Sequence, residues 1–255
     1  MRKYYFIALV AIATLAVLAG CKKEDEDSIS ISAVSKGTSM KAGLNGKDYE
    51  VVDLGLSVLW ATCNMGADSP ELKGNLYAWG ETKSKDVFEW TNYKWCVEDE
   101  FSLTKYCMNK NNGYHELVDD KDVLEMDDDA AYTTMGTGWH IPTEQNFFEL
   151  RRNTTAKWCK LNGVGGFLFT STKEGYEDRS IFFPLVGMND YGTTRFDKEY
   201  GYYWANTIYY DKQKNKYSTL EASVFWLDHL DLDNQTVMFR PRYVGLPIRP
   251  VHDKD

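Results

Sequence analysis

One stretch of the chain combines aromatic rings with charged and amide side chains. Tyr191 and Phe196 carry the rings, and Asn189, Asp190 and Arg195 carry hydrogen-bonding groups, among glycine and threonine residues that are typical of a loop. Long loops on a rigid scaffold are where binding sites concentrate. We therefore predict that these five residues bind a ligand. A loop without a binding role is the alternative, and the residues alone leave it open.

Trp79 and Glu81, separated by one glycine, are a second candidate for ligand binding. A flat indole can stack on a sugar ring, and a neighbouring carboxylate can accept hydrogen bonds from the sugar hydroxyl groups. The alternative is a buried tryptophan beside a glutamate that caps a turn. That arrangement is the stronger competitor, but both residues stay in the candidate site.

The sequence contains none of the motifs that would indicate an enzyme. Its four histidines are not spaced as metal ligands, and it has no nucleophile elbow, phosphate-binding loop or dinucleotide-binding glycine motif. We expect a protein that is not an enzyme, with no catalytic residue, cofactor or metal. The acidic runs 127–129 and 231–234 could offer oxygens to calcium, but they also suit a helix start and a turn.

Four of the five cysteines lie beyond the N-terminal segment. An even number of cysteines in an oxidising compartment favours disulfides. Cys96 and Cys107 flank a turn-prone stretch, so we predict a Cys96–Cys107 bridge, with Cys63–Cys159 as the second. Four cysteines allow three pairings, and free buried thiols are the alternative.

The N-terminus has the layout of a secretory signal. Arg2 and Lys3 precede an apolar stretch that is too short to span a bilayer comfortably, and small residues follow up to Cys21. Residues 18–21 resemble the bacterial lipobox, whose cysteine is lipidated and becomes the first residue after cleavage. We predict a lipoprotein signal peptide at 1–20 and an acyl anchor of the palmitate type on Cys21. An ordinary signal peptide with a chance cysteine is the alternative.

A run of charged residues, 22–27, follows the predicted anchor. It resembles the export signal of surface lipoproteins in Bacteroidota, so we expect the outer membrane, with the domain facing the cell exterior. A short motif of the same bacteria would place an O-linked glycan on Ser28. Cleavage removes Arg2 and Lys3 and takes the formal net charge from −9 to −11, which disfavours nucleic acid as a partner.

Composition divides the mature chain into a tether and a domain. Residues 21–45 are rich in serine, lysine, glycine and acids, which predicts a flexible acidic tether. Residues 46–255 have the composition of one globular domain, rich in aromatic residues.

The domain alternates short strand-like segments with turns. Asn162 and Gly163 form the clearest hairpin-turn signal. Two short helices are predicted, at 127–132 and at 143–151, the second capped by Thr143. This mixture predicts an α+β fold with short antiparallel strands, few short helices and long loops.

Segments spread along the domain share, in order, the pattern of one known family. They are residues 52–67, 77–82, 93–96, 103–107, 128–131, 138–143, 181–184, 201–204 and 245–251. Together they resemble the Fibrobacter succinogenes major paralogous domain family, known as FISUMP. The resemblance implies a domain similar to the sulfatase-modifying-factor group, a variant of the C-type-lectin-like fold.

Three departures from the family pattern bear on this resemblance. His140 stands where the family commonly has arginine, and Ala205 where it often has serine, and neither change threatens the implied fold. The formylglycine-generating enzymes of the related group need a late pair of cysteines. No cysteine follows Cys159, which argues against that activity.

These observations predict a lipid-anchored cell-surface protein whose lectin-like domain binds a glycan or a protein partner without catalysis. The alternative is a structural or accessory subunit of a surface assembly. An enzyme of the sulfatase-modifier type is a third hypothesis, which the missing late cysteines oppose.

Overall fold

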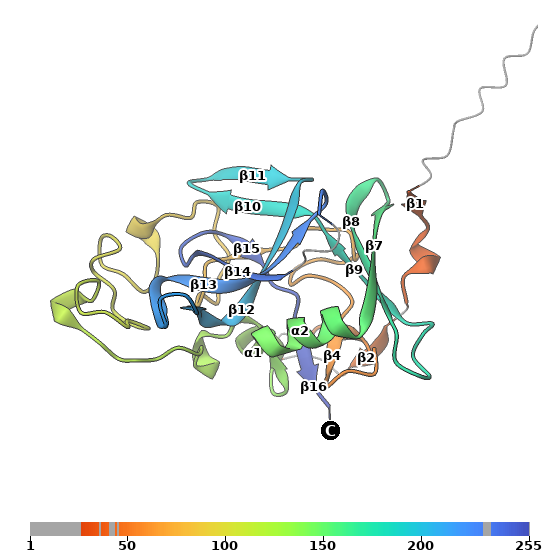
Figure 1. Ribbon diagram of the computed structural model, residues 1–255, viewed down its shortest axis with the longest axis horizontal. Coiled ribbons are helices and arrows are strands. Elements are labelled where there is room, and N and C mark those ends of the chain that lie inside the picture. The colour runs from red at the N-terminus through yellow and green to blue at the C-terminus, as the bar shows by residue number, and fades with distance from the viewer. Residues whose placement is uncertain (1–26, 36, 41–43, 45, 232–235, 255) are drawn as a thin grey trace, which may run out of the picture.

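The structure is a computed structural model that describes residues 27–35, 37–40, 44, 46–231 and 236–254 (Figure 1). The predicted signal peptide, the predicted lipid site Cys21 and the charged run up to residue 26 lie outside the described residues. Most of the second acidic run, from 232 onward, lies outside them too.

The fold is β-rich, and the α+β class predicted from the sequence is wrong. Strands make up 40% of the structure and helices 12%, with two α-helices and a curled sheet shaped like half a barrel. The strands at its centre are long rather than short: β12 (Tyr200–Asp211) has 12 residues and β13 (Lys216–Asp228) has 13. Each of these strands is longer than either α-helix, so the sheets define the class.

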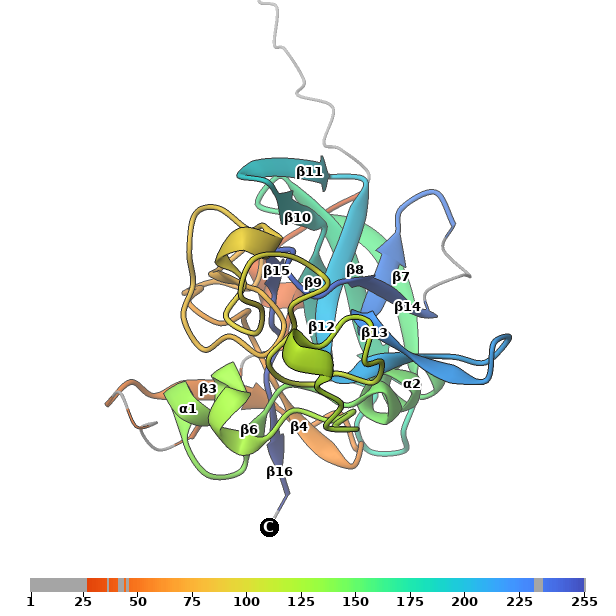
Figure 2. The same cartoon turned by 90° about the vertical axis from the view of Figure 1, so that its left-hand side faces the viewer.

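β12 and β13 form the middle of a five-stranded sheet in the order β11-β10-β12-β13-β14. Its other strands are β10 (Val186–Asp190), β11 (Thr193–Asp197) and β14 (Thr236–Pro241). The β10–β11 hairpin projects from one side of the molecule, at the top in both views (Figures 1 and 2).

A second sheet has four strands in the order β1-β7-β8-β9. They are β1 (Ser28–Ile29), β7 (Thr154–Leu161), β8 (Val164–Ser171) and β9 (Ser180–Pro184). Asn162 and Gly163 join β7 to β8 with φ values of 49° and 81°, the left-handed pair that a tight hairpin needs. The predicted turn is confirmed.

The remaining strands form two further sheets. A five-stranded sheet contains β2 (Thr38–Met40), β3 (Tyr49–Val52), β4 (Val58–Ala61), β16 (Val251–Asp253) and β6 (Trp139–His140). A two-stranded sheet pairs β5 (Leu76–Tyr77) with β15 (Leu246–Pro247).

The two α-helices start where side chains can satisfy their free backbone N–H groups. Thr143 Oγ1 accepts from the Asn146 N–H at 3.0 Å, so α2 (Glu144–Arg152) begins at the predicted cap. α1 (Ala130–Met135) begins three residues later than the predicted start at 127, because Asp129 is its cap. Short 3-10 helices lie at Ile31–Ala33, Trp90–Asn92, Tyr114–Glu116 and Met126–Asp128.

The core is built largely from aromatic rings. Phe147 on α2 stacks on Phe225 of β13 with ring centroids 4.7 Å apart, and Trp60 of β4 lies 5.5 Å from Phe147. All three side chains are buried. Offset and edge-to-face packing of this kind adds to the burial of apolar area, so the aromatic richness of the sequence is explained by the core.

Part of the predicted tether belongs to the domain. Ser28 and Ile29 pair in parallel with β7, and Val34 is only 5% exposed, in a small cluster with Cys159 and Phe182. The ordered domain therefore begins before residue 46. Ser28, the predicted glycosylation site, is exposed on this edge strand.

The two predicted disulfides are absent, because all four described cysteines are free thiols. Cys96 Sγ donates to the Trp90 carbonyl at 2.7 Å, and Cys107 Sγ donates to the Asn109 carbonyl at 3.1 Å. Cys159 is buried in the small apolar cluster, while Cys63 is half-buried beside Thr62. The thiols fill separate local environments. Burial raises the pKa of Cys107 and of Cys159, which keeps both thiols protonated.

Candidate functional site

The five residues predicted to bind a ligand lie on a β-hairpin rather than in a loop. β10 and β11 pair antiparallel, with Met188 opposite Arg195 and Asp190 opposite Thr193. Gly187 makes this pairing possible, because it has a φ of 62° and a Cβ there would collide with the Arg195 carbonyl oxygen. The structure brings all five predicted residues together on this one element.

Contacts with two other segments hold the hairpin in place. Asn189 exchanges two backbone hydrogen bonds with Gly245, each 2.9 Å long. Tyr191 N–H donates to the Phe88 carbonyl at 3.0 Å, and the Asn189 side-chain amide donates to the Asp86 carbonyl at 3.1 Å. These contacts make the hairpin a fixed platform instead of a free loop.

Two aromatic side chains of the hairpin face solvent. Tyr191 is 56% exposed and Phe196 is 43% exposed. Each ring packs edge-on against a tyrosine beneath it: Tyr191 against Tyr243, and Phe196 against Tyr200, both with centroids 5.6 Å apart. The supporting tyrosines leave the outer ring surfaces free while restricting their motion.

Asp190 connects the charged part of the hairpin to its aromatic part. Its carboxylate accepts from Arg195 Nε at 2.9 Å and from the Tyr243 hydroxyl at 2.9 Å. Burial, reinforced by the Asp190 carboxylate, raises the pKa of Tyr243, so this hydroxyl stays a donor. The side-chain positions of Asp190, Arg195 and Tyr191 are thus linked. We call Asn189, Asp190, Tyr191, Arg195 and Phe196 the hairpin platform.

Trp79 and Glu81 are both buried within the domain. Trp79 is fully buried and its indole N–H donates to the Ala205 carbonyl at 2.9 Å. Glu81 is 7% exposed and its carboxylate accepts from Lys85 Nζ and from the Lys94 backbone N–H. The burial of Trp79 contradicts the predicted stacking of its indole on a sugar, because the indole is a core ring. Glu81 fixes a turn and also lines a hollow beside Thr82 and Lys83, so its ligand-binding role stays a prediction.

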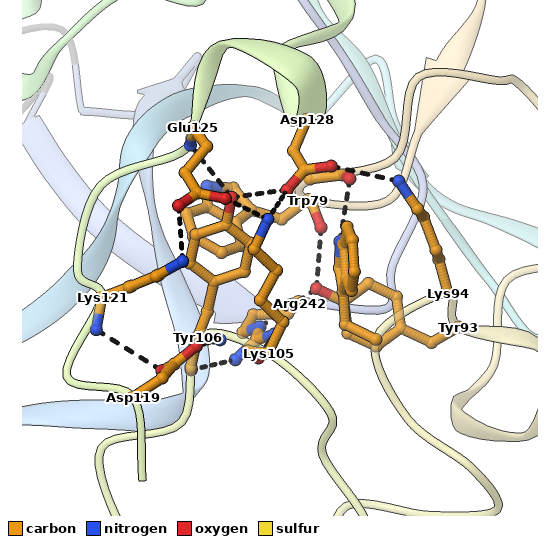
Figure 3. A network of polar contacts seen from close by, with 12 residues as sticks. Trp79, Tyr93, Lys94, Lys105, Tyr106, Asp119, Lys121, Glu125, Asp128 and Arg242 are labelled. Atoms are coloured by element: carbon orange, nitrogen blue, oxygen red, sulfur yellow. Dashed lines mark hydrogen bonds and ion pairs between the residues drawn. The ribbon is translucent and has the colours of Figure 1, made fainter.

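Close to Trp79 lies a buried polar network that the sequence did not reveal (Figure 3). Arg242 is fully buried and donates to the carbonyl oxygens of Tyr106 at 2.7 Å and Thr219 at 2.9 Å, and to the Tyr93 hydroxyl at 3.1 Å. Its guanidinium also lies 5.2 Å from the centre of the Trp79 ring. One side chain therefore ties β13 to the long segment between β5 and α1.

Asp128 is the anionic centre of the same network. Its carboxylate accepts from Lys105 Nζ at 2.5 Å, from the Tyr106 hydroxyl at 2.7 Å and from Lys94 Nζ at 3.1 Å, as Figure 3 shows. Burial alone would raise the pKa of Asp128, but these hydrogen bonds outweigh it and hold the pKa below the usual range. Lys105 also forms an ion pair with Glu125, whose side chain is exposed to solvent. Hydrogen bonds from Lys105 and Lys121 lower the pKa of Glu125 to about 2.

The network joins segments that are far apart in the sequence. Asp128 and Arg242 both bond to Tyr106, and the amines of Lys94 and Lys105 lie over the Trp95 ring, 4.1 Å and 4.8 Å from its centre. The acidic run that could have bound calcium is used in the same way. Asp128 joins the network, Asp129 caps α1, and Asp127 is exposed.

A second buried arginine joins the end of β4 to β9. Arg249 is fully buried and donates to the Asn64 side-chain oxygen at 2.9 Å and to the carbonyls of Thr62 and Phe182, each at 2.9 Å. Its guanidinium lies 4.6 Å from the centre of the Phe183 ring. No local pattern separates Arg242 or Arg249 from surface arginines. Their position beside apolar strand residues was the one available signal.

No protein-family model, no curated protein and no solved structure matches this chain. The class that the fold defines is a β-rich domain with a hairpin platform and two arginine-centred internal networks. Among the described residues, no helix is both long enough and apolar enough to cross a membrane.

Proposed function

We propose that this chain is a lipid-anchored protein of the bacterial cell surface whose domain binds glycans without catalysis. The observation that carries the binding role is the hairpin platform. It presents exposed Tyr191 and Phe196 rings beside the Asp190–Arg195 ion pair on a fixed element. A sugar offers apolar ring faces to aromatic side chains and hydroxyl groups to carboxylates and guanidinium groups.

The proposed location rests on the N-terminal residues. The lipobox-like residues 18–21 end at Cys21, and the charged run 22–27 follows. Several acyl chains anchor a protein firmly, because each buried methylene contributes about 0.8 kcal/mol. The FISUMP resemblance covers the domain and stays a prediction.

We expect labelled palmitate to be incorporated into the wild-type chain and not into a Cys21→Ala variant. The variant should leave the membrane fraction and appear in the soluble fraction of the cell, because the acyl chains are the proposed anchor. The measurement is metabolic labelling followed by fractionation. A Cys21→Ala variant that still partitions with membranes would contradict the proposed anchor.

Replacing Tyr191 with alanine is expected to weaken glycan binding about tenfold, the equivalent of about 1.4 kcal/mol for one stacked aromatic ring. The measurement is binding of the full-length chain to a glycan array, followed by titration of the strongest glycan. Arg195→Ala should weaken binding of the same glycan, because it removes the ion-pair partner that orients Asp190.

Phe101→Ala is the matched control, because Phe101 is a 62% exposed aromatic residue outside the hairpin platform. Its glycan binding should equal that of the wild type. Two results together would contradict glycan recognition: an array that shows no bound glycan, and a second protein that co-purifies in stoichiometric amount. They would instead support a role as a subunit of a surface assembly.

A further inference from the structure

A hollow lies away from the hairpin platform. Residues 108–120 and the turn end of the β12–β13 hairpin line an open cavity of about 720 Å³. Both segments lie at the left end of the molecule in Figure 1, on the side away from β1, and this end faces the viewer in Figure 2. Sites for small ligands typically measure about 300–1,000 Å³, so the size suits one or two sugar residues.

The walls of this cavity are held by backbone contacts. Ile208 N–H donates to the Asp122 carbonyl at 2.8 Å, and Leu124 N–H donates to the Asn206 carbonyl at 2.9 Å. Asp119 accepts from the backbone N–H groups of Tyr106 and Cys107. The segment that forms one wall is therefore fastened both to β12 and to the buried network.

The lining combines an aromatic ring with polar groups that have spare bonding capacity. Tyr217 is 37% exposed and packs edge-on against Tyr210, with centroids 5.0 Å apart. Within the described chain, the Asp120 carboxylate makes no hydrogen bond and no ion pair. Glu221 uses one carboxylate oxygen for the Ser218 hydroxyl, which leaves the other oxygen available.

We infer that this cavity, which we call the distal pocket, binds one neutral sugar residue of a glycan. The Tyr217 ring would carry an apolar face of the pyranose, and the Asp120 and Glu221 carboxylates would accept from its hydroxyl groups. The Asn109 amide, which also lines the pocket, supplies a donor.

Charge excludes an acidic ligand from the distal pocket. Lys214 is paired with Asp211 at 2.9 Å, so it contributes little field to the hollow. Asp120 and Glu221 then outnumber Lys216 among the remaining charged lining groups. A phosphate, sulfate or uronate would meet net negative charge, whereas a neutral sugar pays no such electrostatic cost.

The distal pocket differs from the hairpin platform in location and in shape. β1 leads from the predicted anchor and lies at the opposite end of the molecule in Figure 1. A domain anchored through β1 would therefore present the distal pocket away from the membrane. The inference deepens the proposed glycan binding by naming a site and a sugar class, and it does not require the hairpin platform to bind.

The test measures binding of the full-length chain, kept in detergent micelles, to methyl glycosides of glucose, galactose, mannose and N-acetylglucosamine. Saturation-transfer NMR detects binding, and titration gives the affinity. We expect at least one neutral glycoside to bind, and Tyr217→Ala to weaken it about tenfold, as expected for loss of one stacked ring. Asp120→Asn should weaken it too. Asparagine tolerates the φ of 50° at this position, so the change tests the carboxylate and not the backbone.

Tyr114→Ala is the matched control, because Tyr114 is a 44% exposed tyrosine of the same region that does not line the distal pocket. If Tyr217→Ala fails to fold, Asp120→Asn decides the result. The inference is overturned if no neutral glycoside binds, if methyl glucuronide binds more tightly than methyl glucoside, or if Asp120→Asn keeps wild-type affinity.

The two glycan sites fail separately. Binding that responds to Tyr191→Ala but not to Tyr217→Ala or Asp120→Asn overturns the distal pocket and leaves the hairpin platform. The converse pattern supports the distal pocket and overturns the hairpin platform.

Discussion

Replacing Arg249 with leucine should lower the free energy of unfolding by about 4 kcal/mol, since several buried acceptors each cost about 1–3 kcal/mol when left unpaired. The guanidinium donates to Asn64 Oδ1 and to the carbonyls of Thr62 and Phe182, and these groups lie in the protein interior. Leucine fills part of the volume but offers no donor. The measurement is urea unfolding followed by tryptophan fluorescence.

Arg152→Leu is the control for this change. Arg152 is exposed on α2, so its replacement should alter the free energy of unfolding by no more than about 0.5 kcal/mol. Arg249→Lys should be nearly as damaging as Arg249→Leu, because an ammonium group cannot reach three separated acceptors in one plane. A stability of Arg249→Leu within 1 kcal/mol of the wild type would show that the arginine is not the tie between β4 and β9.

Local signals in the sequence were sufficient for some elements of the fold. Asn162 and Gly163 fit the left-handed backbone of a tight turn better than other residues, so the β7–β8 hairpin could be predicted. Thr143 and Asn146 could likewise be recognised as the start of α2, because capping depends on residues only three apart.

Elements that depend on distant partners could not be predicted in this way. Residues 188–200 have the composition of a loop, but β10 pairs with β11 and Asn189 also pairs with Gly245. Tyr200 starts β12 by pairing with Asp228 of β13. Ser28 and Ile29 look like tether, but the free edge of β7 binds them. In both cases the tertiary context overrides local propensity.

The candidate site shows the same division. Tyr191 and Arg195 could be proposed from the sequence because aromatic and charged residues stand out against a turn-rich background. Trp79 has the same side chain as a sugar-stacking residue, and only its burial assigns it to the core. The distal pocket could not be proposed from the sequence because its walls come from segments about 100 residues apart, Asp120 on one and Tyr217 on the other.

The buried network is connected to both walls of the distal pocket. Arg242 holds Tyr106 and Thr219, and Thr219 lies two residues from Tyr217 in β13. Asp119, next to Asp120, is fixed by the backbone of Tyr106. Binding costs less conformational entropy when the walls of a pocket are already held in place than when they must be ordered by the ligand. We therefore expect that changes which destabilise the network also weaken binding in the distal pocket.

Replacing Asp128 with alanine is expected to lower the free energy of unfolding at pH 7 by about 3 kcal/mol, because removing one partner of a buried ion pair leaves the others uncompensated. Asp128 is 3% exposed and accepts hydrogen bonds from Lys94, Lys105 and Tyr106. Asp127→Ala is the matched control, since the neighbouring aspartate is exposed and should change stability by less than about 0.5 kcal/mol.

The loss caused by Asp128→Ala should depend on pH in a definite direction. The folded pKa of Asp128 lies below the ordinary value of 3.8, so its contribution is complete above that value and disappears as the pH falls through the folded pKa. The contribution of Glu125 to stability is likewise lost as the pH falls from 4.5 to about 2, because its pKa is lowered from 4.5 to about 2. Urea unfolding at pH 7, 5 and 2 should therefore show the wild type and Asp128→Ala converging in acid. A difference that is as large at pH 2 as at pH 7 would mean that Asp128 acts through packing, and not through the charge that its three donors stabilise.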